Sequence, residues 1–172
     1  QGRNIYGGIL IRSIKNVTND EFIVGPCKTV NYILQQTGSA QIEDLISHMK
    51  SNECSDSQNP FYLTFESLSD QHPVIFTGPR VGLSMKYPEY LVTEYRYLKR
   101  PDKISKNRNT IISSLYQKGF KEDQIHTLTQ LSIPVIDRAI KDYTFGQKLD
   151  QIANLKPDKI NLIMGYLSVH TN

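Results

Sequence analysis

Apolar residues in the first part of the chain form short groups that are typical of β-strands. Four segments have such patterns: residues 6–14, 61–65, 74–76 and 95–98. The first is a β-branched run that follows two glycines, and this pattern predicts a buried strand. Apolar residues at 30, 33 and 34 predict a helix over residues 29–36, and a second helix or turn is expected around residues 42–49. The polar stretch at residues 51–60 predicts a loop.

The pattern changes near residue 109, after which the sequence is poor in glycine. Four segments then show helical periodicity: residues 111–115, 123–128, 133–140 and 158–167. We therefore expect an α+β protein. Its body, residues 1–108, would hold a mixed, mainly antiparallel curved sheet with short helices, and residues 109–172 would form an all-helical tail.

The tail contains a segment that resembles a helix-turn-helix. Within residues 119–140, the apolar positions are 125, 128, 131, 136 and 140. Ser132 is placed to cap the second helix, and a proline follows in its first turn. A helix that reads DNA should expose polar or basic side chains. The second helix offers mainly Asp137, Arg138 and Lys141. We therefore give equal weight to two roles for it: packing or docking of a protein partner, and recognition of DNA.

Positive charge is concentrated in one short segment. The 172 residues include 20 Lys and Arg against 17 Asp and Glu, for a net charge of +3. Six cations lie between residues 96 and 108, and Asp102 is the one acid among them: Arg96, Lys99, Arg100, Lys103, Lys106 and Arg108. This composition predicts a strand that ends in a cationic loop able to neutralise phosphates, with a solvated surface loop as the alternative.

A second anion-binding candidate is the tetrapeptide Gly25-Pro26-Cys27-Lys28. It comes directly before the predicted helix, where backbone N–H groups and the helix dipole favour an anion. A Gly-Pro turn is also a common way to begin a helix, so an ordinary helix start remains the alternative.

Several kinds of chemistry lack a sequence signal. The two cysteines, Cys27 and Cys54, have neither a metal-ligand spacing nor the number of a disulfide framework, which favours a reducing intracellular compartment, nucleus or cytoplasm. The four histidines are scattered, so we expect no metal and no cofactor. No nucleophile can be paired with a base, and no apolar run is long enough to span a membrane.

Ordered short motifs over the first 108 residues resemble the second half of the alkyladenine (3-methyladenine) DNA glycosylase family. The motifs are Tyr6-Gly7-Gly8-Ile9-Leu10-Ile11-Arg12-Ser13-Ile14, Gly25-Pro26-Cys27-Lys28, Asp44-Leu45, Pro79-Arg80-Val81-Gly82-Leu83, Tyr95-Arg96-Tyr97 and Ile104-Ser105. The resemblance implies an enzyme that flips a damaged purine out of duplex DNA and hydrolyses its glycosidic bond through a glutamate-activated water, without metal. The family's water-activating glutamate precedes the matched region, so no catalytic residue is assigned here.

The resemblance also implies roles for individual residues. Arg12 would lie beside the base pocket, and Gly25, Pro26 and Lys28 would lie against the DNA backbone. The cationic segment adds Arg96, Lys99, Arg100 and Lys103 to the predicted DNA-binding residues. The expected function is thus part of a purine-excising DNA glycosylase with damaged double-stranded DNA as partner. The alternatives are a non-catalytic nucleic-acid-binding module and an interaction protein that docks a partner through its helical tail.

Overall fold

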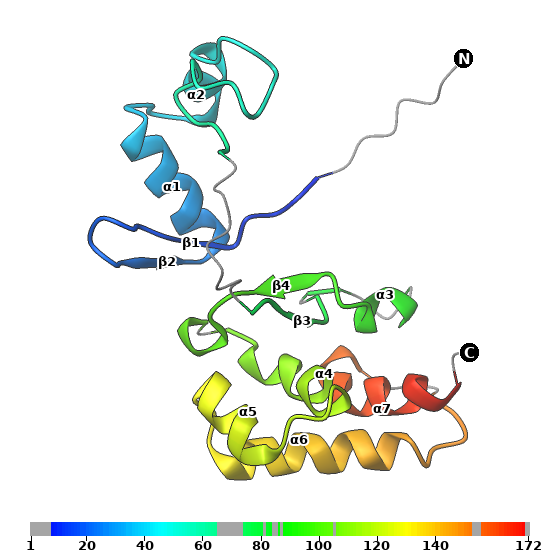
Figure 1. Cartoon of the computed structure of the whole chain (residues 1–172). Helices are drawn as coiled ribbons and strands as arrows, with labels where there is room; N and C mark the ends of the chain where they lie inside the picture. Colours follow the sequence, from blue (N-terminus) through cyan, green and yellow to red (C-terminus); the bar gives the residue numbers. More distant parts are fainter. Residues whose placement is uncertain are drawn as a thin grey trace, which may run out of the picture. The chain divides into compact units, whose positions relative to one another are not determined.

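The computed structural model describes residues 8–64, 74–80, 82–83, 86, 88–104, 106–152 and 156–170 (Figure 1). The chain is α+β, with short antiparallel sheets and a helical C-terminal region, as the sequence predicted. It divides into two compact units, Gln1–His72 and Pro73–Asn172. Residue 108, after which the helical tail was expected to begin, lies within the second unit.

The first unit is built on a β-hairpin followed by two helices. Strands β1 (Ser13–Lys15) and β2 (Phe22–Val24) pair antiparallel, with Ile14 opposite Ile23. Asn16 and Asn19 side chains accept backbone N–H groups in the connecting turn, as expected for asparagine in turns. Helix α1 (Pro26–Gln36) begins directly after β2, and α2 (Ile42–Ser47) follows.

Two strand predictions in this unit are wrong. The strand expected over residues 6–14 is realised only from Ser13, and the described residues before it are exposed, with Ile9 at 95%. Among the described residues, positions 8–11 of this run have no paired strand and no packed layer, and such a run is buried only where both are present. The second error concerns residues 61–64, which form no strand, while Phe65 lies outside the described residues.

The loop over residues 51–60 was predicted correctly, and it is ordered around one buried asparagine. Asn59 Oδ1 accepts the N–H groups of Lys50 and Ser51 at 2.7 and 3.1 Å. Its Nδ2 donates to the carbonyls of Ser51 and Glu53. A single side chain therefore supplies the hydrogen bonds that a regular element would otherwise give this backbone.

The second unit combines a β-hairpin with a helical layer. Strands β3 (Phe76–Gly78) and β4 (Arg96–Leu98) pair antiparallel, with α3 (Pro88–Val92) between them in sequence. Short 3-10 turns at Pro101–Lys103 and Arg108–Ile111 lead into the helices. These are α4 (Ile112–Gln117), α5 (Glu122–Thr129), α6 (Ile133–Gly146) and, after a 3-10 turn at Pro157–Lys159, α7 (Ile160–His170).

The main hydrophobic core lies between this hairpin and the helices. Its buried residues are Leu98, Ile111, Ile112, Leu115, Ile125, Ile136, Ala139 and Ile140. Phe76 packs against this core and meets Phe120 edge to face, so that β3 and β4 are held on the helical layer. The helices lie together on one side of the hairpin (Figure 1).

Helices α6 and α7 approach unusually closely through two glycines. A Cβ added at Gly165 would lie 2.7 Å from the Tyr143 carbonyl carbon, and one added at Gly146 would lie 2.9 Å from that of Leu162. Ordinary carbon–carbon contacts are about 3.5–4.0 Å. The absence of side chains at these two positions therefore permits the backbones to touch.

Candidate nucleic-acid interface

The first unit brings together two segments that the sequence assigned to DNA. Gly25 has φ 119°, a conformation suited to glycine, and its N–H donates to the Arg12 carbonyl at 2.8 Å. This hydrogen bond continues the hairpin by one step beyond β1. The backbone of Arg12 is thereby held next to the start of α1, and the four predicted residues Arg12, Gly25, Pro26 and Lys28 gather at one end of the hairpin.

The amino end of α1 has an uncapped, electropositive first turn. Gly25 offers no capping side chain, and the first turn contains no acidic residue. Pro26 has no N–H, and within the described residues the N–H groups of Cys27 and Lys28 have no acceptor. Open N–H groups and the positive end of the dipole attract anions. This end of α1 is therefore suited to a phosphate.

Two cationic side chains accompany this turn. Arg12 and Lys28 are both exposed, and neither side chain has an ion-pair partner among the residues that the structure describes. Thr29, at the next position of α1, is buried with its Oγ1 unpaired. The cationic groups are thus available to a ligand from solvent.

In the second unit, the arginines of the cationic segment hold the segment's own backbone. Arg96 Nη1 donates to the Asn107 carbonyl at 2.9 Å and to Thr110 Oγ1 at 3.2 Å. Its Nη2 donates to the Lys106 carbonyl at 3.3 Å. Asn107 has a left-handed backbone conformation, which turns its carbonyl out of the helical path. Arg96 therefore closes the loop between β4 and α4.

Arg108 has a similar structural role. Its Nε donates to the Ile104 carbonyl at 2.6 Å, and its Nη1 donates to the Thr129 carbonyl at the end of α5 at 2.8 Å. These bonds tie the cationic segment to the helices. A count of charges in the sequence could not separate such structural arginines from those that meet a ligand.

Asp102 neutralises part of the remaining charge. Arg100 donates to both oxygens of this carboxylate, at 2.8 and 2.7 Å, and Lys103 lies 3.7 Å from it. The Arg100 hydrogen bonds are the main cause that holds the pKa of Asp102 below its ordinary value. In the described part of the chain, Lys99 and Lys106 are the cations of this segment whose ammonium groups have no partner.

The helix-turn-helix segment forms two helices at the expected positions. Helix α5 ends at Thr129, and α6 begins after Ser132, with Pro134 in its first turn. The outer surface at the start of α6 is apolar, since Ile133 and Val135 are 42% and 41% exposed. Further along, Lys141 is paired with Asp137 at 2.7 Å.

One polar cluster in the second unit was not singled out by the sequence. Thr77 on β3 donates to Glu94 Oε2 at 2.5 Å, and the Lys118 ammonium binds the same oxygen at 2.7 Å and also Thr77 Oγ1. Burial raises the pKa of Glu94, but the hydrogen bonds from Lys118 and Thr77 and the charge of Lys118 outweigh burial, so the pKa lies below its ordinary value. The cluster joins β3 to α4 and holds a charged carboxylate.

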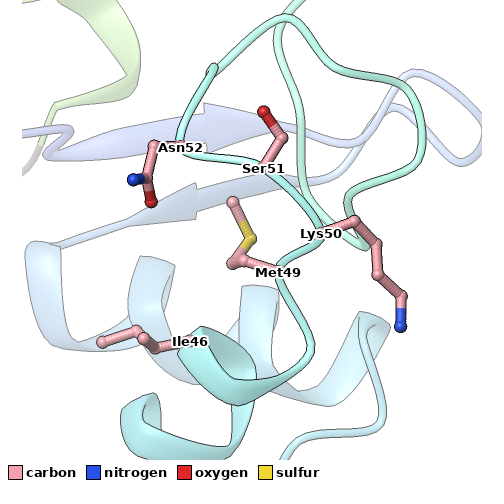
Figure 2. Close-up of a pocket in the computed structure, with 5 residues that line it drawn as sticks. All are labelled: Ile46, Met49, Lys50, Ser51 and Asn52. Atoms are coloured by element: carbon pink, nitrogen blue, oxygen red, sulfur yellow. The ribbon is translucent and has the colours of Figure 1, made fainter.

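The first unit also contains a hollow of about 420 Å³ at the end of α2 (Figure 2). It is lined by Ile46, Met49, Lys50, Ser51 and Asn52. Figure 2 shows the Lys50 side chain pointing away from Met49. None of these lining groups is a carboxylate or an imidazole, so they provide no acid–base pair.

Two further features bear on the range of functions. Over the described ranges, no three His, Cys, Asp or Glu side chains come together as metal ligands. None of the described helices combines the length and apolar character needed to cross a membrane.

Comparison with known proteins finds similarity to a viral protein of unassigned function. The chain is 39% identical over 107 residues to an uncharacterized protein of Acanthamoeba polyphaga mimivirus. The aligned region covers 62% of this chain and 48% of that protein, so the chain spans about half the length of the relative. No family model and no solved structure matches the chain.

Proposed function

We propose that this chain binds duplex DNA as part of a DNA-3-methyladenine-type glycosylase, an enzyme class that flips and excises damaged purines. The observation that carries the proposal is the hydrogen bond between Gly25 and Arg12. It joins two motifs that are separate in sequence and to both of which the family resemblance gives a place at the DNA. A convergence of this kind is what a shared binding surface requires.

The electrostatics of this helix start also favours DNA binding. The first turn of α1 presents the N–H groups of Cys27 and Lys28, with the Lys28 ammonium beside them and the Arg12 guanidinium unpaired within the described residues. A phosphate at this turn would gain charge-assisted hydrogen bonds as well as the dipole. Such contacts bind and orient a duplex; they do not cleave a glycosidic bond, and we assign no catalytic residue in this chain.

The cationic segment has a narrower role in this proposal. Arg96 positions the loop, while Lys99 and Lys106 are the exposed cations of the segment that would approach phosphate directly. Arg100 and Lys103 share Asp102, so a phosphate would compete with that carboxylate for them. We therefore expect this segment to contribute less to affinity than its six charges suggest.

The test is binding to a fluorescently labelled duplex, followed by anisotropy at several salt concentrations. Arg12→Ala and Lys28→Ala should each lower the slope of log affinity against log salt by about 0.9, because each removes one phosphate contact. Lys50→Ala, which removes an exposed cation of the same unit that lies away from this turn, is the control. Equal slopes for Lys28→Ala and Lys50→Ala would contradict the proposed surface.

A protein-binding function is the second candidate, and the apolar start of α6 favours it. Ile133 and Val135 are exposed where a DNA-reading helix would offer polar side chains. Ile133 also lines a hollow of about 520 Å³ together with Tyr116 and the first turn of α5. If this candidate is correct, Ile133→Ser should abolish partner binding while the affinity for duplex DNA stays unchanged.

A further inference from the structure

Tyr95, Tyr97 and Lys99 form an exposed row in and directly beside β4. Leu98 is buried in the main core, and Arg96 turns toward the loop that it closes. Because side chains alternate along a strand, Tyr97, which lies between these two, faces the other way and is 67% exposed. Tyr95, which directly precedes the strand, is 57% exposed, and Lys99, which directly follows it, is also exposed.

Among the described residues of this unit, the helices pack on the opposite side of the hairpin (Figure 1). There Leu98 is buried in a core with residues of α4, α5 and α6. Thr77 is paired in register with Tyr97, and its hydroxyl donates to Glu94. Lys118 neutralises the Glu94 carboxylate. The Lys99 ammonium therefore gives the row a net positive charge.

We propose that Tyr95 and Tyr97 form a stacking platform for unpaired bases of single-stranded DNA, with the Lys99 ammonium on the adjacent phosphate. Alternate residues of a strand are about 6.6 Å apart, which separates the two rings enough for each to take its own base. Exposed aromatic side chains next to a cation characterise surfaces that bind single strands without sequence preference. This inference rests on the proposed DNA binding and adds a second, distinct strand-binding surface.

The charge of this row favours single-stranded DNA over an apolar protein surface as its ligand. Each tyrosine has a polar hydroxyl at its tip, and the row ends in an ammonium rather than in further apolar side chains. A protein partner would have to cover Lys99 and pair it, whereas a nucleic acid supplies a phosphate with every base. The row therefore fits a nucleotide chain.

The experiment measures anisotropy of a labelled oligothymidine of about 15 nucleotides, a length within the usual site size of such surfaces. Tyr97→Leu should weaken binding about 5- to 100-fold, because it removes the aromatic ring and keeps apolar area. Tyr97→Phe should bind within about twofold of wild type, since the ring remains. Tyr62→Leu, at an exposed tyrosine of the first unit, is the matched control. Circular dichroism confirms that each variant is folded.

The outcomes separate this inference from the proposed function. Single-strand binding that is unchanged by Tyr97→Leu overturns the platform, and so does a loss with Tyr97→Phe equal to that with Tyr97→Leu. If duplex binding still depends on Arg12 and Lys28, the proposed function stands. If single-strand binding depends on Tyr97 and no duplex is bound, the platform stands and the proposed function fails. A dimer that dissociates with Tyr97→Leu would make this face an interface between copies and overturn the inference.

Discussion

Replacing Gly165 by alanine tests the close packing of α6 and α7. The added Cβ would lie 2.7 Å from the Tyr143 carbonyl carbon and closer still to its oxygen. An ordinary contact at this position requires about 3.6 Å, so the helices must separate by about 1 Å. The obstacle is backbone, which cannot rotate away as a flexible side chain could.

The magnitude follows from two opposing effects. Overpacking of a tightly fitted interface costs about 1–3 kcal/mol, and a backbone clash lies at the upper end of this range. Alanine gains about 1 kcal/mol over glycine in the interior of a helix. Gly165→Ala should therefore lower the free energy of unfolding by about 2 kcal/mol, which corresponds to a fall in Tm of about 10 °C for a unit of this size.

Thermal unfolding followed by circular dichroism at 222 nm measures this change. Val169→Ala, on the same helix at a half-exposed position, is the control and should shift the free energy by no more than about 0.5 kcal/mol. The sign of the effect decides the matter. A variant that is more stable than wild type would show only the gain in helix propensity and would refute the close contact.

Gly146 provides an independent check on the same geometry. Its Cβ would meet the Leu162 carbonyl, so Gly146→Ala should also destabilise the second unit. Both substitutions are relieved by the same separation of α6 from α7. The double variant should consequently lose less stability than the two single losses added together, because the second methyl group enters a gap that the first has opened. Additive losses would indicate two unrelated defects.

Three further predictions concern polar contacts. The fold holds the pKa of Glu94 below its ordinary value of 4.5, so the stability that its carboxylate contributes is present above that pH and is lost as the pH falls through the lower pKa of the folded state. The Tm difference between wild type and Glu94→Gln should thus vanish on acidification, and a constant difference would contradict this. Asn59→Ala should leave backbone groups of the 50–60 loop unpaired. The protection of this loop from amide hydrogen exchange should then fall by about 2 kcal/mol. Unchanged protection would show that the loop does not depend on this side chain. Asp102→Asn should remove the carboxylate charge that competes with phosphate for Arg100 and steepen the salt dependence of duplex binding by about one contact; no steepening would remove this segment from the DNA surface.

The helices of the chain other than α3, and the β4 strand, could be predicted from the sequence because their signals are local. The periodicity of residues 133–140 and the Ser132–Pro134 start define α6 without reference to the rest of the chain. The Gly-Pro sequence indicated a helix start nearby, although α1 begins at Pro26 and the helix was predicted only from residue 29. Local hydrogen bonds and side-chain entropy determine whether and where a helix forms. Residues close together in the sequence are therefore enough to predict it.

Features that depend on distant partners could not be predicted in this way. The run before Ser13 has the residues of a buried strand, but burial requires a layer to cover it, and Ile9 has none. Likewise, Arg96 and Arg108 look like ligand-binding cations in sequence, yet the left-handed turn at Asn107 and the end of α5 bring carbonyls to them. The gathering of Arg12 with Gly25 was suggested only by the family resemblance, and it depends on the register of the hairpin.

The most direct test of the proposed DNA surface is a titration of the ¹⁵N-labelled chain with a short duplex, followed by amide chemical shifts. We expect the largest changes at the N–H groups of Cys27 and Lys28, which have no acceptor among the described residues and would donate to a phosphate. Shifts should also appear at Arg12, and they should diminish as salt is added. Binding that leaves the amides of Cys27 and Lys28 unmoved would contradict the assignment of this helix start to DNA.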